Sequence, residues 1–358
     1  MREESLEFLK ELLTTPSAAG FESPGQKIWC HYARQCADEV RTDAYGNAVA
    51  VINPGGDPKI MLDGHADEIG LMVKHIDDKG VIYFQRNGGV DPALVRGKRV
   101  NIHTPKGIVR GAIGAATMHL LEDPKEKPDK PPKMHESYID IGAKDRKDAE
   151  KKVAVGDPIT FVDDFEIING SVAVARAFDN RVGTWSVIEA LRLASEKKKQ
   201  LKCAIYACSA VQEELGGFGA VMNVANVEPD AAIVVDVTHA TDTPGIDVKQ
   251  HGEIKLGAGP TVSRGRENHP VVIQRLRDAA KKKKINLQTE TFSLTGGTNA
   301  LSIYARCGGV PSAVVGIPNR YMHTTVEMID LKDLQRTAEL LAEFCLDLKK
   351  GERFKVKV

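Results

Sequence analysis

Several common features are missing from this 358-residue chain. There is no excess of charge of either sign, because 49 Lys and Arg residues balance 49 Asp and Glu residues. A global field that would attract nucleic acid or an anionic membrane surface is therefore absent, and we expect neither partner. No hydrophobic run reaches the length of a membrane-spanning helix. Residues 1–17 place leucines at helical spacing among charges, which indicates an amphipathic surface helix and not a secretion signal.

Cysteine pairs and common catalytic motifs are also lacking. The six cysteines form no C-x-x-C pair, so we expect reduced, mostly buried thiols and a cytoplasmic protein. A G-x-S-x-G elbow, a Walker A loop, a G-x-G-x-x-G loop after a strand and an H-E-x-x-H helix are all absent. These absences argue against serine hydrolases, P-loop proteins, Rossmann enzymes and zincins.

The chain instead contains an alternation of strands and helices. Continuous apolar runs predict strands that are buried on both faces, as in a parallel or mixed sheet; they cover residues 59–62, 203–211, 231–237 and 310–317. Amphipathic helices are predicted after Asp179, over 270–284 and over 331–348. The pattern predicts an α/β fold, an αβα sandwich.

One stretch differs from the rest. Residues 73–165 contain short β-like segments, many glycines and no long helical pattern. We therefore expect a β-rich insertion there, between a first part of the main domain at 1–72 and a second part at 166–358.

Acidic residues and histidines follow the predicted strands. In the segment KIMLDGHADEIG a strand leads into His65 and Asp67. A histidine that binds a metal through one ring nitrogen needs its other N–H held, and a nearby carboxylate can do this. A solvated turn with two polar residues is the alternative.

Further acids follow other segments. Asp179 directly precedes a predicted helix, where it could be an N-cap or a carboxylate that bridges two cations. Glu213 and Glu214 follow a long apolar strand, and adjacent buried acids are costly unless cations or water compensate them. One of the two could bind a metal while the other acts as a general base, and spacing does not decide which.

Asp236 ends another apolar run, and His323 lies in a loop just past the last predicted strand. We assign His239, His251 and His269 to the surface or the core. Because the carboxyl ends of neighbouring parallel strands converge on one crevice, these separate signals predict a single site. Its carboxylate and imidazole ligands suit a pair of zinc, cobalt or manganese ions.

These motifs together resemble the dinuclear-metal aminopeptidases, the family of the tetrahedral (TET), glutamyl and deblocking aminopeptidases. The resemblance covers nearly the whole chain, and its motifs are GHADEIG (64–70), AFDNRVG (177–183), QEELGG (212–217), VVDVTHA (234–240) and MHTTVE (322–327). It implies a phosphorylase/hydrolase-like αβα catalytic domain, interrupted by a barrel-like oligomerisation domain. It also implies a homo-oligomer, a dodecamer or smaller.

The resemblance assigns roles to the site residues. It implies two divalent ions per subunit, zinc or cobalt. One ion would be bound by His65 and Asp236 and the other by Glu214 and His323, and Asp179 would bridge the two. Asp67 would orient His65, and Glu213 would be the general base. The chain departs from the family at Asn299, where an aspartate is usual.

The predicted function is metal-dependent removal of N-terminal residues from peptides. A glycan hydrolase is the alternative, because some members of the family are named endoglucanases and two carboxylates can cleave glycosidic bonds. The small aromatic content, 5% with two tryptophans, speaks against sugar binding. A non-catalytic scaffold is a third hypothesis, which metal analysis would test.

Overall fold

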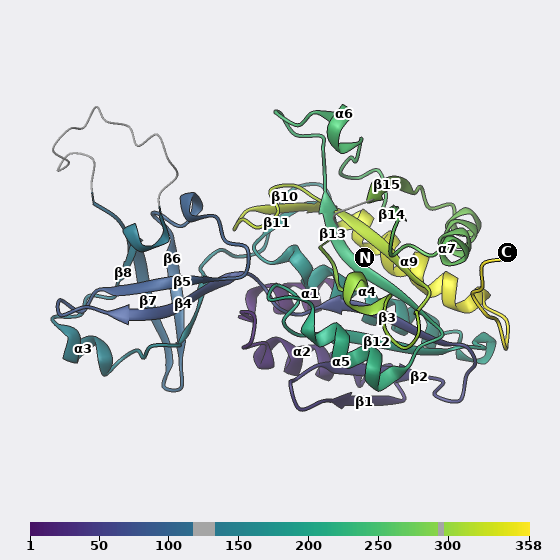
Figure 1. Cartoon of the computed structure of the whole chain (residues 1–358), viewed down its shortest axis with the longest axis horizontal. Coiled ribbons are helices and arrows are strands. Elements are labelled where there is room, and N and C mark those ends of the chain that lie inside the picture. Colours follow the sequence, from purple (N-terminus) through teal and green to yellow (C-terminus); the bar gives the residue numbers. More distant parts are fainter. Residues whose placement is uncertain (117–132, 293–296) are drawn as a thin grey trace.

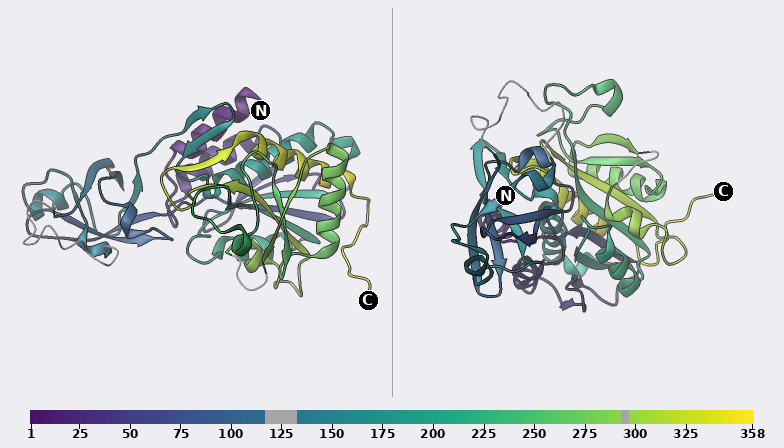
Figure 2. Two further views of the ribbon diagram at one scale, coloured as in Figure 1. Left: turned by 90° about the horizontal axis from the view of Figure 1, so that it is seen from above. Right: turned by 60° about the vertical axis from the view of Figure 1, so that its left-hand side comes forward.

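The computed structural model describes residues 1–116, 133–292 and 297–358. Two lobes are visible, a larger α/β lobe that contains both termini and a smaller β-rich lobe that projects from it (Figure 1, Figure 2). The predicted fold class, an α/β sandwich with a barrel-like insertion, is thereby confirmed. In the described part of the chain, no helix has both the length and the apolar character that crossing a membrane requires.

The large lobe is built on an eight-stranded mixed sheet. In spatial order its strands are β1 (Glu39–Thr42), β2 (Ala48–Ile52), β12 (Ala204–Ala210), β3 (Lys59–His65), β13 (Ala231–His239), β16 (Ser312–Asn319), β14 (Thr261–Gly265) and β15 (Gln288–Phe292). The four central strands, β12, β3, β13 and β16, are parallel and correspond to the four predicted apolar runs. They are buried almost throughout, because helices cover both faces.

The two faces of the sheet carry different helices. The larger core contains residues of α1 (Glu3–Thr14), α2 (Ser23–Ala33), α4 (Phe178–Ser195), α7 (Pro270–Lys283) and α9 (Leu331–Asp347). The other face packs against α5 (Phe218–Val227) and α8 (Asn299–Ile303). Side chains alternate between faces along a strand, so Ile60 and Leu62 belong to the first core and Met61 to the second.

Sequence signals explain the helix boundaries. α7 begins with Pro270, whose fixed φ suits a first turn, and ends with three lysines near the negative end of the helix dipole. The helices predicted over 270–284 and 331–348 correspond to α7 and α9. The large lobe also contains the short helices α6 (Val248–His251) and η4 (Lys198–Gln200).

The small lobe is a closed barrel with its own core. In spatial order its strands are β4 (Gly70–Ile76), β5 (Ile82–Asn87), β8 (Tyr138–Asp140), β7 (Gly107–Gly114), β6 (Arg99–Thr104) and β9 (Pro158–Phe161). Short helices accompany them: η1 (Pro92–Leu94), η3 (Met134–Glu136) and α3 (Arg146–Glu150). Buried apolar residues such as Ile82, Val100 and Ile159 fill the barrel.

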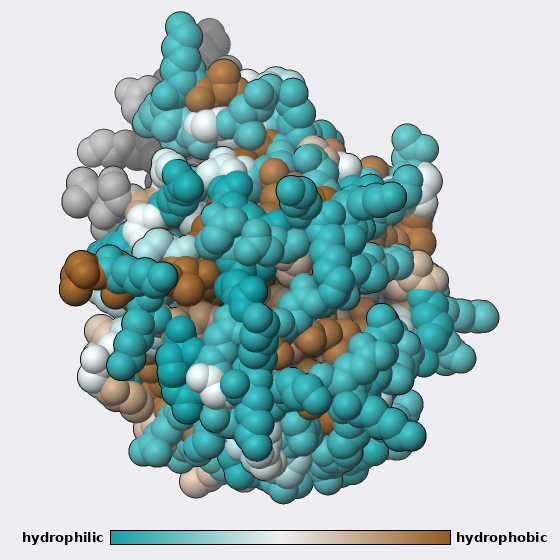
Figure 3. All heavy atoms as spheres, turned by 90° about the vertical axis from the view of Figure 1, so that its right-hand side faces the viewer, coloured by the Kyte–Doolittle hydropathy of each residue, from teal (hydrophilic) through white to brown (hydrophobic). Residues whose placement is uncertain are grey.

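A three-stranded sheet joins two strands that follow the barrel in the chain to a strand that lies between β16 and α9. It consists of β10 (Glu166–Asn169), β11 (Val172–Ala175) and β17 (Glu327–Asp330). Hydrophilic side chains cover most of the outer face of the large lobe, with smaller hydrophobic areas between them (Figure 3). The polar residues that the sequence singled out lie instead at the edge of the central sheet, where the barrel begins.

Candidate metal centre

The predicted site residues meet at the carboxyl ends of the central strands. His65 is the last residue of β3 and is in register with Ala210, the last residue of β12. Glu213 and Glu214 follow β12 after a short turn, while Asp236 lies near the end of β13. The parallel arrangement therefore gathers these groups at one edge of the sheet, as expected.

Glycines allow α4 to bring Asp179 to this edge. A Cβ atom on Gly64 of β3 would lie 2.5 Å from the carbonyl carbon of Gly183 in α4, and one on Gly183 would lie 2.6 Å from the carbonyl oxygen of Val235. The helix can thus pack directly on the strands. Asp179 and Asn180 are not helical, and Oδ1 of Asn180 accepts the main-chain N–H of Gly183, so Asn180 and not Asp179 caps the regular part of α4.

Asp179 lies between the two histidines. Its Oδ1 atom is 3.2 Å from Nε2 of His65, and its Oδ2 atom is 3.3 Å from Nε2 of His323. Asp236 is 3.8 Å from His65, and Glu214 is 3.5 Å from His323. His65, Asp179 and Asp236 form one group with metal-ligand spacing, and Asp179, Glu214 and His323 form another. A third group, without Asp179, consists of His65, Glu213 and Glu214. One carboxylate is therefore shared by two potential cation sites.

Asp67 lies behind this constellation and is fully buried. Its main-chain oxygen is 3.2 Å and its Oδ1 atom 3.3 Å from Nδ1 of His65, so Asp67 orients the ring with Nε2 facing Asp179. The Asp67 carboxylate also accepts the main-chain N–H groups of Glu213 and Glu214, each at 3.0 Å. The backbone of the Glu213–Glu214 turn and the His65 ring therefore share one buried anchor.

Three acids of the site are held in an environment that disfavours their charge. Burial raises the pKa of Glu213 to about 7 and of Glu214 to about 8, and it raises the pKa of Asp236 as well. Burial opposes the charged form of His65, but the carboxylates around it, Glu213 foremost, raise its pKa well above the usual value. Such crowded buried acids fit a site whose charge divalent cations would balance.

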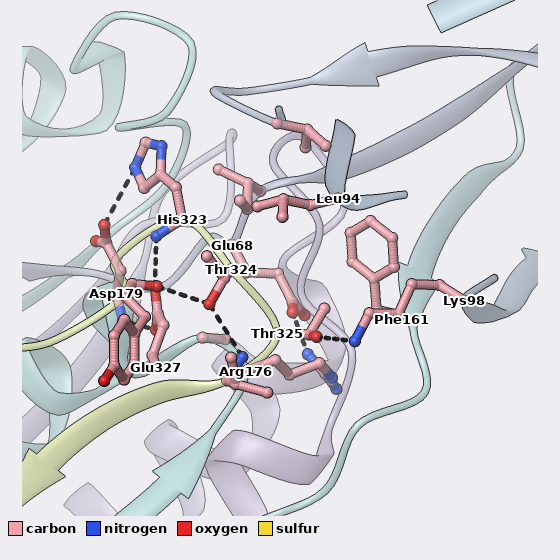
Figure 4. A pocket seen from close by; sticks show the side chains of 15 residues that line it. Glu68, Leu94, Lys98, Phe161, Arg176, Asp179, His323, Thr324, Thr325 and Glu327 are labelled. Carbon is pink, nitrogen blue, oxygen red and sulfur yellow. Dashed lines mark hydrogen bonds and ion pairs between the residues drawn. The ribbon is translucent and has the colours of Figure 1, made fainter. Parts of the chain in front are cut away.

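Glu327 is a site residue that sequence reasoning did not assign. It is buried, and its two oxygens accept the main-chain N–H groups of Asp179 and His323, each at 3.0 Å (Figure 4). It therefore ties together the backbones of two potential ligands from distant segments. The only sequence signal was its place at the end of the MHTTVE motif.

A cleft of about 690 Å³ opens over the site. It is lined by His65, Asp179, Glu213, Glu214, Asp236 and His323, together with His239, Phe292 and Leu301. His239, which we assigned to the surface or the core, is thus exposed within the cleft. His251 and His269 are not among its lining residues.

Asn299 does not line the cleft either. Its side chain is buried, and its Nδ2 atom donates to Oδ2 of Asp63 at 2.7 Å. Asp63 is a buried residue of β3, two positions before His65. The departure from the usual aspartate at position 299 therefore concerns a buried polar pair, not the wall that a substrate meets.

Known proteins are similar to this chain in sequence and in architecture. The model of the M42 glutamyl aminopeptidase family matches residues 46–340. The lysyl aminopeptidase of Pyrococcus furiosus is 32% identical, over 96% of this chain and 97% of that protein. Among solved structures, a TET aminopeptidase from Thaumarchaeota archaeon SCGC AB-539-E09 is 34% identical with a TM-score of 0.91, and the match covers 97% of each chain.

Two further solved structures are informative. The TET1 peptidase of Pyrococcus horikoshii, which can assemble into a tetrahedron or a large octahedral shell, is 28% identical with a TM-score of 0.85, over 96% of this chain and all of that one. A Thermotoga maritima protein that is named an endoglucanase is 29% identical with a TM-score of 0.75, over 94% of this chain and 96% of that one.

Proposed function

We propose that this chain, which belongs to the M42 glutamyl aminopeptidase family, removes N-terminal residues from peptides with the help of two divalent metal ions. The observation that carries the proposal is the position of Asp179, with one oxygen facing each histidine at 3.2 and 3.3 Å. A single carboxylate between two imidazoles is the arrangement that a bridged pair of cations requires.

The spacing supports a division of the ligands. His65 and Asp236 would hold one ion, Glu214 and His323 the other, and Asp179 both. Imidazole and carboxylate ligands suit zinc or cobalt. We assign Glu214 as the ligand of its pair because it lies in one group with Asp179 and His323, whereas the group that contains Glu213 includes neither of them.

Glu213 is left to act as the general base. Divalent ions at these ligands would supply Lewis acidity, which polarises a carbonyl and lowers the pKa of water. The Glu213 carboxylate lines the cleft, and its Oε2 atom is 3.8 Å from His65. A carboxylate in this position can take a proton from the attacking water and pass it to the leaving amine.

We expect the working form to be a homo-oligomer, a dodecamer or smaller. The support is that the Pyrococcus horikoshii TET1 peptidase, which covers 96% of this chain, assembles into closed shells. Light scattering of the purified protein would test this expectation, and a monomer at all concentrations would contradict it.

The test of the function is hydrolysis of amino-acid amides and peptides before and after metal removal. We expect leucinamide and free peptides to be cleaved, N-acetylated peptides to be resistant, and a chelator to abolish activity until zinc or cobalt is restored. Metal analysis should give two ions per subunit. Cleavage of acetylated peptides, or full activity after verified metal removal, would refute the proposal.

Cellulose serves as the control for glycan hydrolysis. The endoglucanase name of the Thermotoga maritima neighbour favours this activity. Sugar-binding clefts usually offer aromatic faces, but Trp29 and Trp185, the two tryptophans of the chain, are each only 1% exposed and lie in the core. We therefore expect no release of sugar, and chelator-insensitive release would support the alternative.

A further inference from the structure

A second hollow adjoins the metal centre on its barrel side. It encloses about 210 Å³, and Asp179 and His323 line both this pocket and the cleft described above. Barrel-lobe residues form one wall, and the loop between β16 and β17 forms the opposite one (Figure 4). The pocket therefore opens beside the groups that would perform the chemistry.

The walls of this pocket are largely apolar. Its main apolar side chains are Ile69, Val90, Leu94, Phe161 and Val326. An apolar cavity of roughly 150 Å³ is large enough to bind benzene. A pocket of about 210 Å³ therefore has room for a leucyl or phenyl side chain but not for several residues of a peptide.

Its charged groups argue against binding an N-terminal amine. Three carboxylates line it in the described part of the chain. Glu68 is paired with Arg176 and Arg181, Glu327 accepts two main-chain N–H groups, and Asp179 faces the two histidines. Lys98 adds a cation on the side opposite His323 (Figure 4). An ammonium group is instead attracted to the cleft, which Glu213, Glu214 and Asp236 line.

We propose that this pocket binds an apolar side chain of the second residue of the peptide, the residue whose amino group leaves. This inference rests on the proposed aminopeptidase function. The free amine and its residue then lie over the acidic cleft, the scissile bond lies near Asp179 and His323, and the next side chain points toward the barrel.

The test uses dipeptide amides Leu-Xaa-NH2, in which Xaa is Gly, Leu, Phe or Asp, with leucinamide as the reference. We expect kcat/KM to be about ten- to a hundredfold higher for Leu or Phe than for Gly, the usual effect of burying such a side chain. Cleavage of leucinamide without any preference at Xaa would overturn the pocket and leave the proposed function standing. No cleavage of any of these amides by the metal-loaded enzyme would overturn both.

Two variants test whether the preference for an apolar residue at Xaa arises from the walls of this pocket. Leu94 and Val326 come from opposite walls and are 45% and 48% exposed, so aspartate at either position is compatible with folding. We expect Leu94→Asp and, independently, Val326→Asp to reduce the Leu/Gly ratio to near one. The matched control is Ile108→Asp on β7, a residue that is 58% exposed and does not line the pocket; it should keep the wild-type ratio.

A second series, Xaa-Gly-NH2, varies the N-terminal residue. If the Leu94 and Val326 variants change the preference in this series and not in the first, the pocket binds the N-terminal side chain and our assignment is wrong. An unchanged ratio in both folded variants, checked by their melting temperatures, would also overturn it.

Discussion

The Oδ1 atom of Asp67 accepts the main-chain N–H of Glu213 at 3.0 Å, and the same oxygen lies 3.3 Å from the His65 ring. The Asp67 main-chain oxygen also lies 3.2 Å from Nδ1 of His65, so one buried residue positions both a potential ligand and the proposed base. In Asp67→Asn an amide group would face an N–H donor at one of these contacts. We expect metal affinity or kcat/KM to fall about 10- to 100-fold, as for other residues that orient metal ligands.

Metal titration and steady-state kinetics would measure this loss. Asp278→Asn on the exposed face of α7 is the control and should behave like the wild type. Wild-type kinetics and metal affinity in Asp67→Asn would show that the carboxylate charge is not needed to hold the site.

Glu213→Gln separates proton transfer from metal binding. If Glu214 and not Glu213 is the ligand, the variant should retain both ions, while kcat falls about a hundredfold or more because the base is lost. Inductively coupled plasma analysis and peptide hydrolysis would measure the two quantities. Glu4→Gln on α1 is the matched exchange at an exposed position. Loss of one ion from Glu213→Gln would reverse the assigned roles of the two glutamates.

Glu22 predicts a pH dependence of stability. It is 4% exposed, and burial raises its pKa from 4.5 to about 7. The folded state therefore binds this proton more tightly than the unfolded state, so stability falls as the pH rises from about 4.5 to about 7. Glu22→Gln should remove this loss. Its gain over the wild type should be small at pH 5 and reach at most about 3 kcal/mol at pH 8.

Glu22→Gln is a conservative exchange because a single oxygen of Glu22, Oε1, accepts both the N–H of Gly20 at 2.7 Å and the N–H of Gln212 at 3.0 Å. A glutamine oxygen can keep both bonds. Thermal unfolding at the two pH values would measure the difference. A variant that is equally destabilised at both would show that hydrogen bonding, not charge, dominates at this position.

The sequence predicted most of this site because its signals are local. Apolar runs located β3, β12, β13 and β16, and the geometry of parallel strands then explains why His65 and Asp236 lie close together. Spacing left the roles of Glu213 and Glu214 open, because adjacent residues follow the same strand and differ only in the direction of their side chains.

The remaining features depend on contacts between distant segments. Glu327 lies 148 residues from Asp179 in the chain, and no periodicity indicates that its carboxylate accepts that main-chain N–H. The second pocket combines Leu94 and Phe161 of the barrel lobe with Val326 of the large lobe. Its existence depends on how the two lobes pack, which a pattern within either segment does not encode.

The buried pair of Asn299 and Asp63 predicts a compensating double substitution. The Asn299 amide donates to Asp63, whose pKa burial raises to about 7. Asn299→Asp would replace the donor with a second carboxylate, and two buried like charges repel each other. We expect the free energy of unfolding of the metal-free protein at pH 8 to fall by about 1–3 kcal/mol, the usual cost of a buried polar group without its partner.

Asp63→Asn combined with Asn299→Asp restores one amide and one carboxylate with their positions exchanged. Because the interaction is reciprocal, the double variant should recover most of the stability lost by Asn299→Asp, and chemical denaturation would measure the recovery. If the losses in unfolding free energy from the two single substitutions simply added up, the hydrogen bond between these residues would not explain why asparagine is needed at position 299. A recovery of stability would instead mean that Asp63 makes an acidic residue at position 299 unfavourable. The residue suited to position 299 would then depend on Asp63 of β3, the strand that also carries His65.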